Sequence, residues 1–147
     1  MTNQIQLSNE GRYLLSLIKE SNGKIEALER KTAKHGREIR DIEEEYPLLP
    51  PEADDLSNVV KKKGVEILGG KKSNAYANTA LRKRVYQDIY LDVKRQYGLI
   101  DEQGRQMSYK KLKRKYLKGA IAVVGEYVAP IALANEIDAE NELDELD

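Results

Sequence analysis

The sequence predicts an all-α protein, with an N-terminal coiled-coil helix followed by a small basic helical domain and an acidic C-terminal tail. Apolar residues in the first third are spaced alternately three and four apart, as in a heptad repeat. Later segments repeat apolar residues about every four positions, as amphipathic helices do. The charged fraction of 34% favours long exposed helices. The expected boundaries are 1–46 for the coiled coil, 47–51 for a Pro-rich hinge, 52–130 for the basic domain and 131–147 for the tail.

Charge is segregated along a chain whose formal net charge is zero. Residues 59–118 hold seventeen of the twenty-five Lys and Arg side chains and only five acids. Residues 1–58 hold eight basic and twelve acidic side chains, and residues 119–147 hold eight acids and no Lys or Arg. A basic segment between acidic ends indicates a binding protein rather than an enzyme.

The absence of cysteine excludes disulfides, thiolate zinc sites and cysteine catalysis. No apolar run approaches the roughly 20 residues that cross a bilayer. The N-terminus also lacks the charged-then-apolar pattern of a signal peptide. We therefore expect a cytoplasmic protein that contacts no membrane.

The heptad seam is long and regular. With Leu7 at a d position, the a and d positions continue to Tyr46 without a slip, which predicts the pairing of two or more chains. An amphipathic helix lying on the protein's own core would show nearly the same spacing. The turn-type cluster at residues 21–23 would, if it divides the helix, leave a coil from Lys24 to Tyr46. The residues assigned to oligomerisation are Leu14, Ile18, Ile25, Leu28, His35, Ile39 and Ile42.

The single histidine, His35, falls at a d position beside Thr32 at an a position. Polar seam residues usually set the register and the oligomer state, at a cost in stability. A ligand-binding or pH-sensing role is the alternative, because a protonated imidazole would loosen the seam in mildly acidic solution. The flanking charges leave the orientation of the paired helices open.

The second part of the chain predicts three helices. The first runs from about Pro51 to Leu68 and ends at Gly69-Gly70, which supplies a left-handed stop. The second runs from about Thr79 to Tyr97 and stops at Gly98. Its inward stripe consists of Leu81, Val85, Ile89, Val93 and Tyr97.

The third helix is predicted from Tyr109 to Val128, with Ser108 as its N-cap and Pro130 at its end. Before it, the turn signal at residues 101–104 predicts a small hairpin or an exposed loop. After it, a short acidic helix starting at Ile131 is expected, with a frayed C-terminal end.

The sequence predicts no catalytic grouping, no metal site and no cofactor. Asp88 and Asp92 have the spacing of paired carboxylates, but Arg84 and Arg95 lie close enough to form a solvated salt-bridged face with them. A phosphate-binding loop at residues 64–73 is rejected because Gly70 stands where that motif has its lysine. We therefore expect no enzymatic activity.

Basic clusters recur on the predicted helices and on the loop at residues 71–74. If these elements pack together, several clusters would meet on one face and contact phosphates. An acidic protein surface, including the chain's own tail, would account for these residues as well as nucleic acid does, and simple solvation is the third alternative. The tyrosines among them are expected to be core residues rather than a base-stacking platform. The residues chosen as partner or nucleic-acid contacts are Lys71, Lys72, Arg82, Arg84, Lys94, Arg95, Lys110, Lys113 and Arg114.

Five segments carry a resemblance to one family: 60–71 (VKKKGVEILGGK), 74–76 (NAY), 84–90 (RVYQDIY), 91–98 (LDVKRQYG) and 108–112 (SYKKL). In this order they resemble the C-terminal "ORF-six" domain of phage antirepressors and phage regulatory proteins, over about residues 50–127. The similarity is specific because Leu-Gly-Gly-Lys, Ala-Tyr, an aromatic-rich helix, Lys-Arg-x-aromatic-Gly and Ser-Tyr occur in the family's order.

The resemblance implies a regulator that releases lytic genes by countering a phage repressor in the bacterial host cell. Family members typically join a DNA-binding module to this domain through a coiled-coil spacer. No such module precedes the seam in these 147 residues, and the segment 99–107 is longer than the family pattern. We therefore expect a homodimer or higher homo-oligomer that binds a phage repressor or a host regulatory protein. Direct DNA binding through the basic domain is the alternative.

Overall fold

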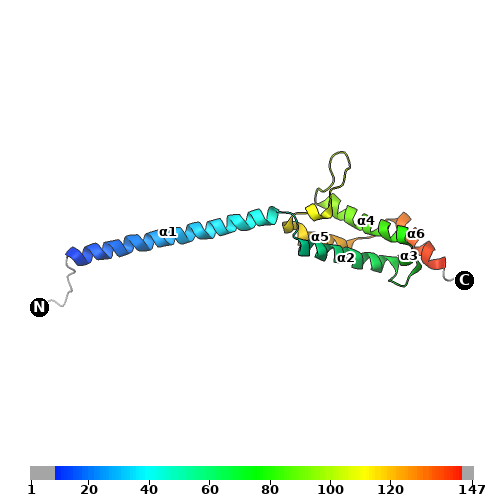
Figure 1. The fold of residues 1–147 in the computed structure, drawn as a ribbon, viewed down its shortest axis with the longest axis horizontal. Helices are drawn as coiled ribbons and strands as arrows, with labels where there is room; N and C mark the ends of the chain where they lie inside the picture. Colours follow the sequence, from blue (N-terminus) through cyan, green and yellow to red (C-terminus); the bar gives the residue numbers. More distant parts are fainter. Residues whose placement is uncertain (1–8, 144–147) are drawn as a thin grey trace. The chain divides into compact units, whose positions relative to one another are not determined.

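The computed structural model describes residues 9–143, and it confirms the all-α fold (Figure 1). The chain divides into two compact units, residues 1–43 and 44–147. Regular structure in the described part is helical, apart from two isolated antiparallel bridges, Pro47 with Lys113 and Ile100 with Gln106.

The first unit is formed by α1, one continuous helix from Asn9 to Glu45 whose last residues belong to the second unit. The cluster at residues 21–23 does not divide α1, since an interior glycine costs a helix only about 1 kcal/mol. None of the side chains of α1 is buried. The seam position Leu7 and the predicted frayed end at residues 144–147 lie outside the described residues.

The second unit is built on three helices that pack on one another: α2 (Pro50–Leu68), α4 (Thr79–Gln96) and α5 (Leu117–Glu126). Beside them, the short α3 (Asn74–Ala77) packs against α6 (Ile131–Glu142), as Figure 1 shows. Buried apolar side chains from these elements form a single core. The largest fully buried side chains are Leu56, Val60, Leu68, Val85, Ile89, Val93, Leu112 and Val124.

Local chemistry sets both ends of α2. Pro50 and Pro51 lie in its first turn, where the missing N–H groups would have no helical partner. Glu52 Oε1 accepts a hydrogen bond from the Leu49 N–H at 3.0 Å, which closes the N-terminal end. At the other end Gly69 and Gly70 have φ values of 97° and 103°, a left-handed conformation that favours glycine.

Side-chain caps start the next two helices. Ser73 Oγ accepts the Tyr76 N–H at 3.2 Å, and Asn78 Oδ1 accepts the Leu81 N–H at 3.1 Å. The predicted stripe of α4 is buried from Leu81 to Val93. The tyrosines of the basic segment 59–118 pack against the core, as expected; they are Tyr76, Tyr86, Tyr90, Tyr97, Tyr109 and Tyr116.

The predicted helix from Tyr109 to Val128 is wrong. Ser108 caps only a 3₁₀ turn, η1 (Tyr109–Lys111). An extended stretch and a second 3₁₀ turn, η2 (Arg114–Tyr116), follow before α5 begins. The predicted helix is therefore replaced by two single turns and a shorter α-helix.

The segment that follows α1 explains this break. The Leu48 N–H donates to the Leu112 carbonyl at 2.9 Å, and the Arg114 N–H donates to the Tyr46 carbonyl at 2.9 Å. Leu48 and Leu112 are both buried, so the extended pairing also fills the core. These long-range bonds use the backbone groups that a helix through residues 112–114 would need.

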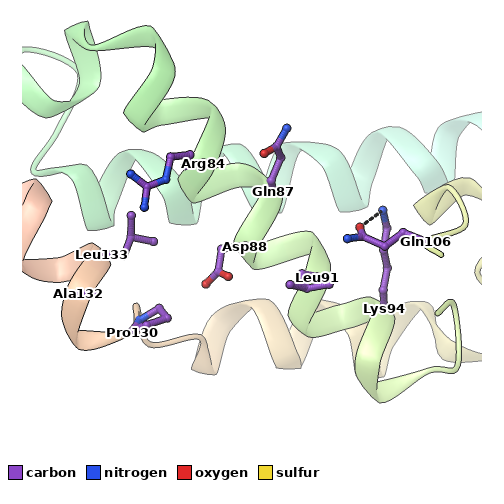
Figure 2. A pocket seen from close by; sticks show the side chains of 9 residues that line it. All are labelled: Arg84, Gln87, Asp88, Leu91, Lys94, Gln106, Pro130, Ala132 and Leu133. Atoms are coloured by element: carbon purple, nitrogen blue, oxygen red, sulfur yellow. Dashed lines mark hydrogen bonds between the residues drawn. The ribbon is translucent and has the colours of Figure 1, made fainter. Parts of the chain in front are cut away.

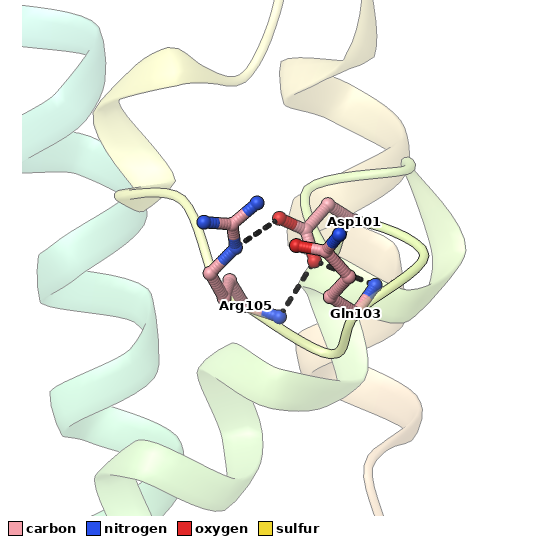
Figure 3. Close-up of polar contacts among 3 residues, drawn as sticks. All are labelled: Asp101, Gln103 and Arg105. Carbon is pink, nitrogen blue, oxygen red and sulfur yellow. Dashed lines mark hydrogen bonds and ion pairs between the residues drawn. The ribbon is translucent and has the colours of Figure 1, made fainter.

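The segment 99–107 forms a narrow hairpin-like loop (Figure 3). Asp101 Oδ1 accepts the N–H groups of Gln103 and Arg105 at 2.9 Å and 2.8 Å, and its Oδ2 pairs with Arg105 Nε at 2.8 Å. These contacts, led by the Arg105 N–H, hold the pKa of Asp101 below its ordinary value. The Asp101 carboxylate therefore holds the loop in this conformation.

No single helix among residues 9–143 is long and apolar enough to cross a membrane. A pair of segments, 114–126 and 131–142, passes the same test of length and composition when taken together, with a bend of 58° between them.

Candidate functional site

Arg82 and Arg84 are close in sequence but lie on opposite flanks of α4. Arg82 donates to the Tyr76 carbonyl at 3.1 Å, and its guanidinium lies 4.7 Å from the centre of the Tyr76 ring. Arg84 forms an ion pair with Glu136 of α6. Each helical residue is turned by about 100° from the one before it, so two steps separate the two side chains by about 200°. This basic run is therefore not one surface patch.

Two other predicted contact residues have acidic partners within the second unit. Lys113 Nζ lies 2.6 Å from Glu45 Oε2, and Arg114 Nε donates to Glu52 Oε1 at 2.8 Å. Lys115 also pairs with Glu45. The hydrogen bonds from Lys113 and Lys115 lower the pKa of Glu45 to about 2. These cations are therefore neutralised within the unit.

The remaining predicted contact residues form no ion pair with an acidic side chain among the described residues. Lys94 Nζ donates to the neutral amide oxygen of Gln106 at 3.2 Å. Lys71, Lys72, Arg95 and Lys110 are exposed, and their side chains form no hydrogen bond or ion pair within the described residues.

Lys71 lies at a pocket of about 370 Å³ between α2, α3 and α4, which we call the lysine pocket. Lys61 and Lys62 line it from α2, and both are exposed without a partner in the described part of the chain. The residues that complete its lining are Asn58, Val65, Tyr76 and Tyr86.

Lys61 and Lys62 were not among the predicted contacts. They belong to a basic run whose third member, Lys63, instead donates to the Gly125 carbonyl at 2.9 Å. The spacing along α2 could have separated Lys61 and Lys62 from Lys63. Residues 58, 61, 62 and 65 share one helical face, which lies beside the buried stripe of α2.

The aromatic walls of the lysine pocket are held by close contacts. A Cβ atom at Gly64 would lie 2.3 Å from Tyr86 Cε1, so the Tyr86 ring rests directly on the backbone of α2. Arg82 lies over the Tyr76 ring. Burial raises the pKa of Tyr86 above its ordinary value, so its phenol stays uncharged to a higher pH than that of an exposed tyrosine.

A second pocket, of about 690 Å³, runs between α4, the loop at residues 99–107 and the start of α6 (Figure 2). Its walls carry charges of both signs, Arg84, Asp88 and Lys94. The predicted salt-bridged face of Asp88 and Asp92 with Arg84 and Arg95 is wrong. The Tyr127 hydroxyl donates to Asp88 Oδ2 instead, and Arg84 turns to Glu136.

Residues 9–143 contain no group of three or more His, Asp or Glu side chains that could hold a metal ion.

The apolar side chains of the predicted seam are exposed in the single chain. Their exposed fractions lie between 50% and 62%, and His35 is exposed as well. The apolar seam residues in the described part are Leu14, Ile18, Ile25, Leu28, Ile39 and Ile42.

A family model of the ORF6C domain matches residues 18–137, which is more than half of the chain. The chain belongs to the ORF6C-domain family. This phage-associated regulatory family is the one that the sequence motifs resembled, so that prediction is confirmed. Comparison with curated proteins and with solved structures gives no match.

The ORF6C match is longer than the predicted extent of about 50–127. It begins within α1 and ends within α6. The lysine pocket and the seam from Ile18 onward therefore both lie inside the ORF6C domain. The motifs did not reveal these ends because the glycine and aromatic landmarks are confined to residues 60–112.

Proposed function

We propose that this ORF6C protein is an antirepressor-type regulator that acts by binding and catalyses no reaction. Its partner is a phage repressor or a host regulatory protein in the cytoplasm of the bacterial host. Family membership supports the regulatory class. The binding role rests on one observation: three exposed lysines that form no ion pair within the described residues line the same pocket, namely Lys61, Lys62 and Lys71.

In this proposal two or more copies pair through α1. The exposed apolar stripe of α1 supports pairing, because burying a leucine or isoleucine side chain contributes about 1.5–3 kcal/mol. Repressors that are themselves dimeric would then meet two binding sites on one particle. Simultaneous engagement of both sites raises the overall affinity without any new contact.

A protein partner is favoured over DNA by the distribution of the basic residues. Arg84, Lys113 and Arg114 have acidic partners in the same chain. Duplex DNA is a long array of phosphates, and affinity for it grows with the number of phosphates that are neutralised. The three lysines that line the lysine pocket suit a compact acidic surface better.

The test compares the two partners with the same protein. Tagged full-length chain is used to capture purified cognate repressor. In parallel, a mobility-shift series with operator DNA is run between about 0.05 and 0.2 M salt. We expect capture of the repressor and weak binding to DNA.

Two outcomes contradict the proposal. Failure to capture any phage or host regulator would remove the antirepressor role. Tight DNA binding that falls steeply with salt would favour the alternative, a DNA-binding protein that contacts phosphates through its basic helices.

A further inference from the structure

The lysine pocket is a concave site whose lysines meet no counter-charge among the described residues 9–143. Lys61, Lys62 and Lys71 line it, and no acidic residue does. The nearest acid along α2 is Glu66, four residues after Lys62, yet the two side chains form no ion pair in the described part of the chain. We propose that this pocket binds an acidic peptide segment in which carboxylates flank an apolar side chain.

The apolar part of the proposed ligand follows from the floor and walls of the pocket. Val65 and the rings of Tyr76 and Tyr86 line the pocket together with the lysines and are half-buried. An apolar side chain placed there would remove its own surface and theirs from water. The surrounding ammonium groups would meanwhile meet carboxylates in charge-assisted hydrogen bonds. The pocket therefore matches a segment that alternates the two kinds of side chain.

The same walls disfavour a nucleotide. A base would stack on a free aromatic face, but Arg82 covers one face of Tyr76 and the Tyr86 ring rests on the backbone at Gly64. Single-strand binders combine contacts to the backbone with bases stacked on aromatic faces, and the pocket lacks the second of these. What the pocket leaves accessible is positive charge around a small apolar surface.

The acidic helix of the chain itself does not fill the pocket. Within the described residues α6 reaches the neighbouring end of the unit, where Asn141 donates to the Leu68 carbonyl at 3.0 Å and accepts the Ala75 N–H at 2.9 Å. The ion pair that α6 makes with a predicted contact residue is on Arg84, on the other flank of α4. Among the described residues, no acidic side chain of α6 therefore occupies the pocket.

This inference rests on the proposed function in one respect, since the acidic segment belongs to the regulator that the protein captures. The test nevertheless needs no regulator. The probe is a short fluorescein-labelled peptide in which leucines separate pairs of glutamates. The full-length chain is titrated into the peptide, and binding is followed by fluorescence anisotropy. The salt concentration is about 0.1 M, at which the Debye screening length is about 10 Å. A peptide with serine in place of leucine and a short DNA duplex are the comparison probes.

Two matched variants locate the binding. Lys61→Glu/Lys62→Glu changes the pocket, and Lys110→Glu/Lys111→Glu makes the same charge change at exposed lysines outside it. All four side chains are exposed, so helix content measured by circular dichroism is expected to stay unchanged. We expect the pocket variant to weaken peptide binding at least about tenfold and the control variant to stay within about threefold. The serine peptide is expected to bind more weakly than the leucine peptide.

Three results would overturn the inference: equal losses in both variants, equal binding of the two peptides, or tighter binding of the duplex that is lost in the pocket variant. The proposed function fails separately. If the pocket binds the peptide but no regulator is captured, the antirepressor role is wrong and the pocket stands. If a regulator is captured equally well by the pocket variant, the role stands and the pocket assignment is wrong.

Discussion

Gly64 places Tyr86 where it forms a wall of the lysine pocket. An alanine at this position would gain about 1 kcal/mol of helix propensity. Its Cβ would, however, lie 2.3 Å from Tyr86 Cε1, which forces the ring to move. Overpacking of this kind costs about 1–3 kcal/mol. We therefore expect Gly64→Ala to lower the free energy of unfolding by about 1 kcal/mol in urea denaturation.

The sign of this effect depends on Tyr86. In a Tyr86→Ala background the obstacle is gone, so the same Gly64→Ala change is expected to become stabilising by a few tenths to about 1 kcal/mol. Gly125→Ala is the control in the intact chain, because no atom lies within 4 Å of its added Cβ. An equal cost of Gly64→Ala in both backgrounds would show that Tyr86 does not rest on this glycine.

Tyr127 and Asp88 tie α5 to α4 through one hydrogen bond. Burial, followed by the bond to Asp88, raises the pKa of Tyr127 above its ordinary value of 10.0. The protonated phenol is the bonded form, so its contribution to stability is complete below pH 10 and is lost as the pH rises further. We expect Tyr127→Phe to lower the free energy of unfolding by about 1–2 kcal/mol at neutral pH.

The hydrogen bond between Tyr127 and Asp88 is tested by comparing the stability of the wild-type protein and of Tyr127→Phe as the pH is changed. The gap in unfolding free energy between the wild-type protein and Tyr127→Phe should narrow above pH 10. A gap that stays constant into the alkaline range would contradict the raised pKa of Tyr127 and its bond to Asp88.

The ion pairs of Glu45 make stability depend on pH in the acidic range, whereas Tyr127 does so in the alkaline range. Hydrogen bonds from Lys113 and Lys115 lower its pKa from 4.5 to about 2. A lowered pKa means that the contribution is present above pH 4.5 and is lost as the pH falls toward 2. Glu45→Gln is therefore expected to lower the melting temperature at neutral pH. The two proteins should converge on acidification in calorimetry, whereas a difference that persists near pH 2 would refute the ion pair.

At the scale of the elements, helix α2 and the buried stripe of α4 were predictable because their signals are local. Proline and glycine mark the ends of α2, and the stripe of α4 repeats every four residues. The short α3 was missed, although Ser73 three residues before Tyr76 offered a capping signal. The break at residues 112–114 was not predictable from local pattern. It depends on hydrogen bonds to residues 46–48, more than sixty positions away.

The element α1 supplies a prediction about pairing. Leu28 lies on the seam and is 62% exposed, while Ala27 is its neighbour outside the seam. A glutamate on the seam would place like charges together in the paired helices. We expect Leu28→Glu to yield monomers in sedimentation equilibrium and Ala27→Glu to keep the mass of the assembly. A wild-type chain that stays monomeric at high concentration would remove the basis for pairing.

At the scale of the whole molecule, the basic character of the second part was predictable but its division was not. Charged runs look uniform in sequence, yet a helix turns adjacent residues toward different neighbours. Arg82 thus packs on Tyr76 at the lysine pocket, while Arg84 pairs with Glu136 of α6. Lys61 and Lys62 line the pocket, while Lys63 bonds to the Gly125 carbonyl. The acids that pair with predicted contact residues are Glu45, Glu52 and Glu136, which lie at the end of α1, in α2 and in α6. Their positions around the core follow from the fold and not from the local sequence.

Pairing and pocket together define how the molecule would work. Each copy offers one lysine pocket, and a pair offers two, so a dimeric regulator would be held at two points. Loss of pairing through Leu28→Glu is expected to weaken capture of a dimeric partner by about 10²-fold or more, while the affinity of each pocket for the short peptide stays unchanged. Unchanged capture by the monomer would show that two-point binding is not used.

The most direct measurement follows operator DNA that is bound by the cognate repressor in a mobility-shift assay. Adding the full-length protein is predicted to return the operator to its free mobility, and Lys61→Glu/Lys62→Glu is predicted to be far less effective than Lys110→Glu/Lys111→Glu. A repressor–operator complex that persists at saturating protein, or that shifts further because the protein joins the DNA, would contradict the account.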